Sequence, residues 1–120
     1  MNAPSLDDVA TTPTDSAATR VTIVFLVSVH AASREELVAE VSKVARISLE
    51  TEDGCLAYDY YLTDGSQTDM LVRQVWASME DYEIHNRQPY VSEMFARYEP
   101  TLIEPVRRMI LKPAFEHVTL

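Results

Sequence analysis

Residues 73–95 read RQVWASMEDYEIHNRQPYVSEMF, and this stretch indicates the fold more clearly than any other part of the chain. An apolar strand ends at Trp76, and Ser78 is a typical first residue of a helix because its hydroxyl can accept a backbone N–H. The expected helix carries Tyr82 and His85 three residues apart, on one face. The stretch therefore predicts a strand that leads directly into a helix with an inward-facing histidine.

The chain after His85 continues the helical pattern. Pro89 can start a further helical segment, or offset the first, because proline is tolerated in a first turn. The apolar stripe that follows at helical spacing consists of Tyr90, Val91, Met94, Phe95 and Tyr98. Pro100 then ends the helix. Residues 106–111, VRRMIL, predict a last strand, and the arginines with Pro105 favour a sheet edge for it.

Upstream, the first ordered element is a strand. Residues 21–29, VTIVFLVSV, are apolar at nearly every position, which is typical of a strand covered on both faces. Ser33 and Glu36 predict a capping box at the start of a helix. The apolar residues of this helix are Leu37, Val38, Val41, Val44, Ala45 and Leu49. We expect it to end before Gly54, where a positive φ is natural.

The middle of the chain predicts a β-hairpin. Residues 55–62, CLAYDYYL, alternate, so that Leu56, Tyr58 and Tyr60 are expected on one face and Cys55, Ala57 and Asp59 on the other. Asp64-Gly65 is a turn signal, and residues 70–76 return as the antiparallel partner.

The predicted order is thus β-α-β-β-α-β, an α+β protein with the ferredoxin-like split motif. Two helices cover only one face of such a sheet, yet the first strand is apolar on both of its faces. A second copy of the chain is the simplest cover for the other face. We therefore expect a homodimer whose sheets pack together.

Composition limits the classes of function. A chain of 120 residues with 47% hydrophobic and 24% charged residues is typical of one soluble globular domain, expected at residues 21–112. Residues 1–20, rich in Ser, Thr, Ala, Asp and Pro, predict a disordered tail, and residues 113–120 a short second tail. The net charge of −9 without a basic cluster argues against nucleic acid and against anionic lipid as partners.

Location and metal binding are also constrained. The N-terminus lacks the features of a secretory signal, no window is apolar enough to span a membrane, and the single Cys55 forms no intrachain disulfide. These features favour the cytoplasm. His30, His85 and His117 lie far apart without a metal-binding spacing, so we expect no metal site.

Taken in this order, the elements resemble the antibiotic biosynthesis monooxygenase family. The resemblance rests on residues 52–55, Glu-Asp-Gly-Cys, at the start of the second strand, and on Trp76, Ser78 and His85, and it spans residues 21–111. It implies a dimeric α+β barrel. It also implies oxidation of polycyclic phenols, which many members of the family perform without metal or flavin.

The chain departs from the family pattern at several positions. Gln74 stands where the family has a glutamate two residues before the tryptophan. Tyr90 stands where a second aromatic residue or histidine is often found. Haem-degrading relatives need an asparagine in the first strand, and this chain has Phe25 there, which disfavours haem degradation.

The resemblance implies a cofactor-independent monooxygenase acting with O₂ on a small phenolic, quinol or polycyclic aromatic substrate. Such a site must bind a flat apolar molecule, accept a proton and exclude water. The candidate catalytic residues are His85 as the proton acceptor, Trp76, and Gln74, which can hydrogen-bond a substrate oxygen but cannot act as a base. The expected substrate-binding residues are Tyr58, Tyr60, Tyr82, Tyr90, Met94 and Phe95.

Alternatives remain at this point. The same pocket could serve an isomerase or cyclase that does not use O₂, or a dimer that binds a small ligand without catalysis. Trp76 and the helical stripe have a structural interpretation as core packing. His85 has one as a hydrogen-bonding residue at the dimer interface, and Cys55 one as a small buried residue of a strand.

Overall fold

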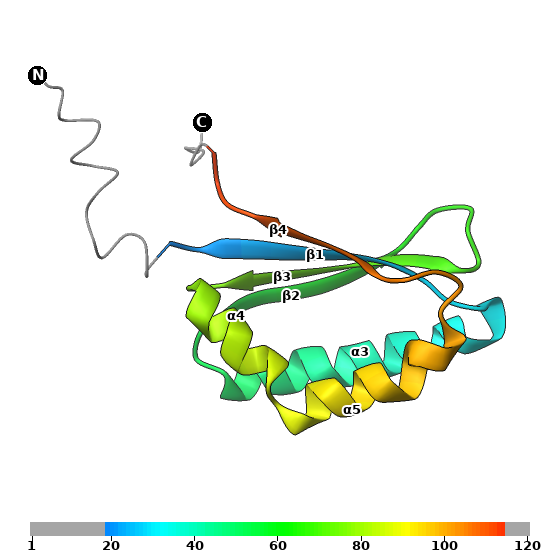
Figure 1. The fold of residues 1–120 in the computed structure, drawn as a ribbon, viewed down its shortest axis with the longest axis horizontal. Coiled ribbons are helices and arrows are strands. Elements are labelled where there is room, and N and C mark those ends of the chain that lie inside the picture. The colour runs from blue at the N-terminus through cyan, green and yellow to red at the C-terminus, as the bar shows by residue number, and fades with distance from the viewer. Residues whose placement is uncertain (1–18, 115–120) are drawn as a thin grey trace, which may run out of the picture.

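A computed structural model describes residues 19–114 (Figure 1). The two predicted tails therefore lie almost entirely outside the described residues. The elements, in chain order, are β1 (Val21–Ser28), α3 (Ala31–Thr51), β2 (Cys55–Leu62), β3 (Asp69–Trp76), α4 (Met79–Asn86), α5 (Pro89–Tyr98), the 3₁₀ turn η1 (Glu99–Thr101) and β4 (Arg107–Leu111). Pro89 does start a further helix: it is the first residue of α5, so the second helical element is divided in two.

The four strands form one antiparallel sheet in the order β2-β3-β1-β4, and the helices cover one of its faces (Figure 1). This order confirms the predicted α+β ferredoxin-like fold. The last strand, β4, lies at an edge, as its arginines indicated.

The core lies between the sheet and the helices. Ile23 of β1 pairs with Gln74 of β3, which pairs in turn with Tyr58 of β2, so these three side chains point to the helix face. The helices contribute the buried side chains of Leu37, Val41, Val44, Ala45, Tyr82 and Tyr98. This packing also places the buried polar side chains of Gln74 and His85 inside the same layer.

The opposite face of the sheet is partly apolar, and it also carries the ion pair between Arg73 and Asp59. Its residues alternate with the core residues along the strands, and those on β1 and β3, Val24, Leu26 and Leu71, are only partly buried. The outer strands add the exposed side chains of Tyr61, Met109 and Leu111. No described helix covers this surface (Figure 1), which we call the outer sheet face.

The start of α3 differs from the prediction. The helix begins at Ala31, its N-cap residue is His30, and no side chain caps it, so the predicted capping box at Ser33 and Glu36 is wrong. Tertiary hydrogen bonds determine the start instead, because the His30 N–H donates to the Thr101 carbonyl at 3.0 Å. The predicted apolar face is confirmed at Leu37, Val41, Val44 and Ala45, which are buried, and the structure differs from the prediction only in the last turns of the helix. Ser48 is fully buried, whereas 48% of Leu49 is exposed.

The chain between α3 and β2 differs in two further ways. A β-bulge lies between Cys55 and Ala57, so Cys55 is buried in the core beside Tyr58 while Leu56 is exposed. The predicted alternation is therefore wrong for these two residues. Leu56 is the extra residue of the bulge, so Cys55 lies on the same face of the sheet as Tyr58 instead of the opposite face. Gly54 does not have a positive φ. Among the described residues only Gly65, in the hairpin turn, has one, at 80°.

Gly54 is required for a different reason, namely the close approach of the Asp81 side chain. A Cβ atom at position 54 would lie 2.3 Å from Cγ of Asp81. Asp81 belongs to the cap of α4, where its backbone N–H donates to Oγ of Ser78 and its carboxylate accepts from the same hydroxyl. The methyl group of an alanine would therefore disturb the start of α4.

We expect Gly54→Ala to lower the free energy of unfolding by about 1–3 kcal/mol, the usual cost of overpacking. Chemical denaturation monitored by circular dichroism measures this change. In the double variant Gly54→Ala/Asp81→Ala the clashing carboxylate is absent, so the total loss should be smaller than the sum of the two single losses. A fully additive result would contradict the proposed clash.

Candidate active site

His85 lies at the centre of the buried layer. The Ser78 cap predicted from sequence starts α4, and His85 follows in its last turn with a fully buried side chain. Trp76, the last residue of β3, packs against it with ring centroids 4.6 Å apart. The rings of Tyr58 and Tyr90 meet the imidazole edge-on, at 5.8 and 6.3 Å. The histidine is thus enclosed by aromatic rings from three elements.

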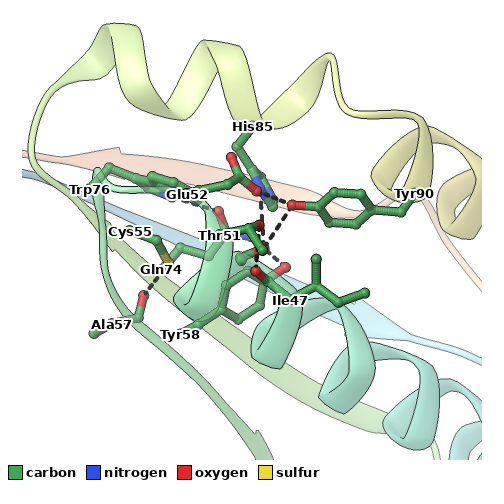
Figure 2. Close-up of polar contacts among 11 residues, drawn as sticks. Ile47, Thr51, Glu52, Cys55, Ala57, Tyr58, Gln74, Trp76, His85 and Tyr90 are labelled. Carbon is green, nitrogen blue, oxygen red and sulfur yellow. Dashed lines mark hydrogen bonds and ion pairs between the residues drawn. The ribbon is translucent and has the colours of Figure 1, made fainter.

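The two nitrogens of His85 have different surroundings. Nδ1 lies 2.9 Å from Oε2 of Glu52 (Figure 2). The hydroxyl of Ser48 is 3.5 Å from the same nitrogen. Nε2 is buried and has no hydrogen-bond partner among the described residues. An unpartnered polar atom in a buried position costs free energy, so it needs an explanation.

Glu52 links the helices around the histidine. It is the C-cap residue of α3, and 10% of its side chain is exposed. The same Oε2 atom also accepts a short hydrogen bond from the hydroxyl of Tyr90 on α5 (Figure 2). Ser48, one helical turn before Glu52, lies 3.4 Å from that hydroxyl. One carboxylate oxygen therefore serves both His85 and Tyr90.

Burial lowers the pKa of His85 below its ordinary value of 6.5, while the hydrogen bond and the charge of Glu52 oppose this effect. The imidazole is then neutral near pH 7. Because a carboxylate can only accept hydrogen bonds, Nδ1 must carry the proton and Nε2 must have the free lone pair. Burial and the bond to Glu52 raise the pKa of Tyr90, so its hydroxyl remains a donor.

A second set of hydrogen bonds links three side chains of the sheet, on the face that packs against the helices. The indole Nε1–H of Trp76 donates to Oε1 of Gln74 at 2.9 Å, and Nε2 of Gln74 donates to the hydroxyl of Tyr58 at 3.1 Å. Burial raises the pKa of Tyr58 far above its ordinary value, so this hydroxyl stays protonated.

A cavity of about 580 Å³ lies between the sheet and the helices. His85, Tyr58 and Gln74 contribute to its wall, which is otherwise mostly apolar. Arg108 of β4 also lines it and donates to the Tyr82 hydroxyl at 3.1 Å. A volume of several hundred cubic ångströms with few polar groups suits a small aromatic molecule.

The structure brings most of the predicted site residues to this cavity. Those that line it are Gln74, His85, Tyr58, Tyr82, Met94 and Phe95. Trp76, Tyr60 and Tyr90 are not part of the lining. Trp76 packs behind His85, Tyr60 is 36% exposed and bonds to Ser42, and Tyr90 bonds to Glu52.

The sequence interpretation missed two residues, Glu52 and Ser48. Glu52 begins the Glu-x-Gly-Cys pattern, which had been used only to locate a strand. Ser48 precedes it by one helical turn, so both could have been assigned to one face of α3.

Other reactive groups do not add to this site. Burial raises the pKa of the Cys55 thiol to about 11, so it remains protonated in the core. Between residues 19 and 114, no three His, Cys, Asp or Glu side chains lie together as metal ligands would. The described helices include none that is long and apolar enough to cross a membrane.

Comparison with known proteins identifies the family. The model of the antibiotic biosynthesis monooxygenase family matches residues 20–97, which include β1 to α4 and most of α5. The chain belongs to the antibiotic biosynthesis monooxygenase family. This agrees with the resemblance seen in the sequence around Trp76 and His85. A search of curated proteins found no match.

Solved structures show the same fold for this family member. A protein from Caulobacter crescentus CB15, provisionally named an antibiotic biosynthesis monooxygenase, is 20% identical with a TM-score of 0.76, over 83% of this chain and 94% of that one. A Mycobacterium tuberculosis protein is 21% identical with a TM-score of 0.75, over 83% and 100%. A Nitrosomonas europaea protein with the same provisional name is 17% identical with a TM-score of 0.73, over 82% and 93%.

Proposed function

We propose that this family member is a monooxygenase that oxidises a phenolic, quinol-like or polycyclic aromatic small molecule with O₂. The unpartnered Nε2 of His85 is the observation that carries the proposal. It is the one buried side-chain polar atom of residues 19–114 without a partner, and its ring lines the cavity. A substrate with an acidic hydrogen would provide the missing donor, and His85 would act as general base.

The reaction can be written for an anthrone, which has a CH₂ group opposite its carbonyl. Nε2 of His85 takes one hydrogen of the CH₂ group as a proton, and the substrate becomes an electron-rich anion. This anion gives one electron to O₂, and the resulting radical pair combines to form a C–O bond. The imidazolium returns its proton to the peroxide to give a hydroperoxide. The remaining C–H hydrogen then leaves as a proton while the O–O bond breaks, so that the carbon becomes a carbonyl, and the released hydroxide takes up a proton and leaves as water. One anthrone and one O₂ thus yield one anthraquinone and one water.

The chain supports each of these steps. The apolar wall of the cavity binds the flat ring system and excludes bulk water, which strengthens the interaction between the anion and the imidazolium. Glu52 holds the proton on Nδ1 and stabilises the imidazolium when it forms. Because the substrate anion itself reduces O₂, we expect the reaction to need neither metal nor flavin.

An oxygen electrode provides the test. The purified protein is incubated with anthrone or a dihydroxynaphthalene in flavin-free buffer containing a chelator. O₂ uptake that depends on the protein, and that equals the amount of quinone formed, supports the proposal. Substrate turnover under nitrogen would replace it with an isomerase or cyclase of the same fold. Ligand binding without turnover in either atmosphere would leave only a ligand-binding protein.

We also propose that a second copy of the chain covers the outer sheet face. This face presents Val24, Leu26 and Leu71 in its centre, beside the ion pair of Arg73 with Asp59. Full burial of an exposed side chain of this size contributes about 1.5–3 kcal/mol, so each of these partly buried residues would contribute less than that to an interface. The exposed side chains of Met109 and Tyr61 extend the same surface to both edges of the sheet. Exposed apolar side chains that are grouped in this way, with polar groups beside them, are typical of an interface.

Sedimentation equilibrium measures the oligomeric state. We expect the wild type to have twice the chain mass of 13.6 kDa. Met109→Glu places a charge on the outer sheet face and should shift the protein to monomer, with an unchanged circular dichroism spectrum. Ile103→Glu, at an exposed position outside the strands, should leave the dimer intact. A monomeric wild type would refute the proposed dimer.

A further inference from the structure

The orientation of the Gln74 amide is determined by Trp76. An indole N–H can only donate, so the group that lies 2.9 Å from it must be the amide oxygen of Gln74. The NH₂ group of Gln74 is then directed to the Tyr58 hydroxyl, 3.1 Å away. Both side chains are buried, with 4% of Gln74 and 7% of Tyr58 exposed, so water does not compete freely for these bonds.

The consequence concerns the hydrogen of the Tyr58 hydroxyl. The oxygen of Tyr58 accepts from Gln74, and the described part of the chain shows no acceptor for its hydrogen. Tyr58 lines the same cavity as His85, and their rings are in edge-on contact. The cavity wall therefore combines an unused acceptor, Nε2 of His85, with an unused donor, the hydroxyl of Tyr58.

We propose that Gln74 positions Tyr58 to donate a hydrogen bond to a substrate oxygen. This inference rests on the proposed function and assigns a positioning role to Gln74. When His85 removes a proton from a substrate such as anthrone, the negative charge moves to the carbonyl oxygen. A fixed donor at that oxygen stabilises the developing charge more than it stabilises the neutral ketone.

A glutamate at this position, as the resemblance implies for the family, would have the opposite effect. A carboxylate has no hydrogen to donate, so it would accept both the Trp76 N–H and the Tyr58 O–H. The Tyr58 hydrogen would then point to the sheet and be lost to the substrate. Gln74 thus reverses the direction of the hydrogen bond at Tyr58.

Binding of fluorenone and fluorene tests this inference without turnover. The two molecules share a ring system, but only fluorenone has a carbonyl oxygen, and fluorenone has no hydrogen for His85 to remove. Their dissociation constants can be measured from the fluorescence of Trp76, the only tryptophan in the chain. Tyr58→Phe and Gln74→Glu should each reduce the preference for fluorenone over fluorene by about tenfold, the usual effect of one hydrogen bond.

Tyr98→Phe is the matched control. Tyr98 also lines the cavity, but its hydroxyl donates to the Glu36 carbonyl, so its removal should leave the preference unchanged. An unchanged preference in Tyr58→Phe would overturn the inference. Loss of the preference in Tyr82→Phe alone would also overturn it, because the donor would then be Tyr82, whose hydroxyl accepts from Arg108.

The carbonyl stretching frequency of bound fluorenone tests the same point on the wild type alone. A hydrogen bond from Tyr58 should lower this frequency relative to fluorenone in an alkane, and a frequency equal to the alkane value would overturn the inference even if the variants fail to fold. Neither readout requires O₂ uptake. Failure of the proposed oxygenase activity would therefore be seen separately, as carbonyl binding through Tyr58 without catalysis.

Discussion

Replacement of His85 by glutamine is expected to lower kcat for O₂ uptake by about 10²–10⁴-fold, the usual contribution of a general base. Glutamine can still donate to Glu52 through its amide, but it has no lone pair of comparable basicity at the position of Nε2. The oxygen electrode measures the rate, and circular dichroism checks that the variant is folded. Affinity for fluorenone should change little, because Tyr58 still donates to the carbonyl.

The matched control for this variant is His30→Gln. His30 is exposed at the start of α3, and only its backbone takes part in the bonds that determine this start. Its replacement should leave the rate unchanged. If folded His85→Gln retains more than about a tenth of the wild-type kcat, His85 cannot be the base.

Glu52→Gln is expected to have the second largest effect. The neutral amide can rotate and donate to Nδ1, which would move the proton of the imidazole to Nε2 and block it as a base. We expect kcat to fall by about 10²-fold. Glu50→Gln, an exposed position two residues earlier, is the control and should not change the rate.

The pH dependence of the Glu52 variant has a definite sign. The rate requires neutral His85, so kcat/KM of the wild type should fall as the pH decreases through the pKa of His85, which burial places below 6.5. The charge and the hydrogen bond of Glu52 raise that pKa, so their removal lowers it further. The acid limb of the pH profile should therefore move to lower pH in Glu52→Gln. A shift to higher pH would contradict the assigned contact.

Much of the fold is encoded in local patterns. The order of the elements, the Ser78 cap, the Gly65 turn and the edge position of β4 follow from periodicity and from residues with special backbone preferences. His85 could be selected from sequence because it follows a capped helix start at helical spacing from Tyr82. These signals depend on neighbouring residues alone.

The missed features depend on tertiary contacts. Glu52 follows the last periodic residues of α3, where a carboxylate usually faces solvent, and only the packing of α4 and α5 across that end brings His85 and Tyr90 to it. The bulge between Cys55 and Ala57 has no glycine or proline within it to mark it. Tyr60 was expected in the pocket with Tyr58, and both lie on β2, but the hydroxyl of Tyr60 bonds to Ser42 of α3 and 36% of the residue is exposed.

The carboxylate of the site was also misplaced by the sequence argument. Gln74 in place of the family glutamate suggested that a charged partner for the reaction had been lost. The structure shows that the carboxylate beside the imidazole is that of Glu52, which bonds to Nδ1 of His85. The amide of Gln74 has a different neighbour, the Tyr58 hydroxyl. The charge that orients the base and the amide that orients the tyrosine are therefore separate.

The tautomer of His85 determines whether this residue can act as the general base. Nitrogen NMR of protein labelled with ¹⁵N-histidine distinguishes protonated from unprotonated ring nitrogens, and a spectrum of His85→Gln assigns the signal. At neutral pH we expect a hydrogen on Nδ1, none on Nε2, and a titration midpoint below 6.5. A hydrogen on Nε2, or an imidazolium at neutral pH, would exclude His85 as the base.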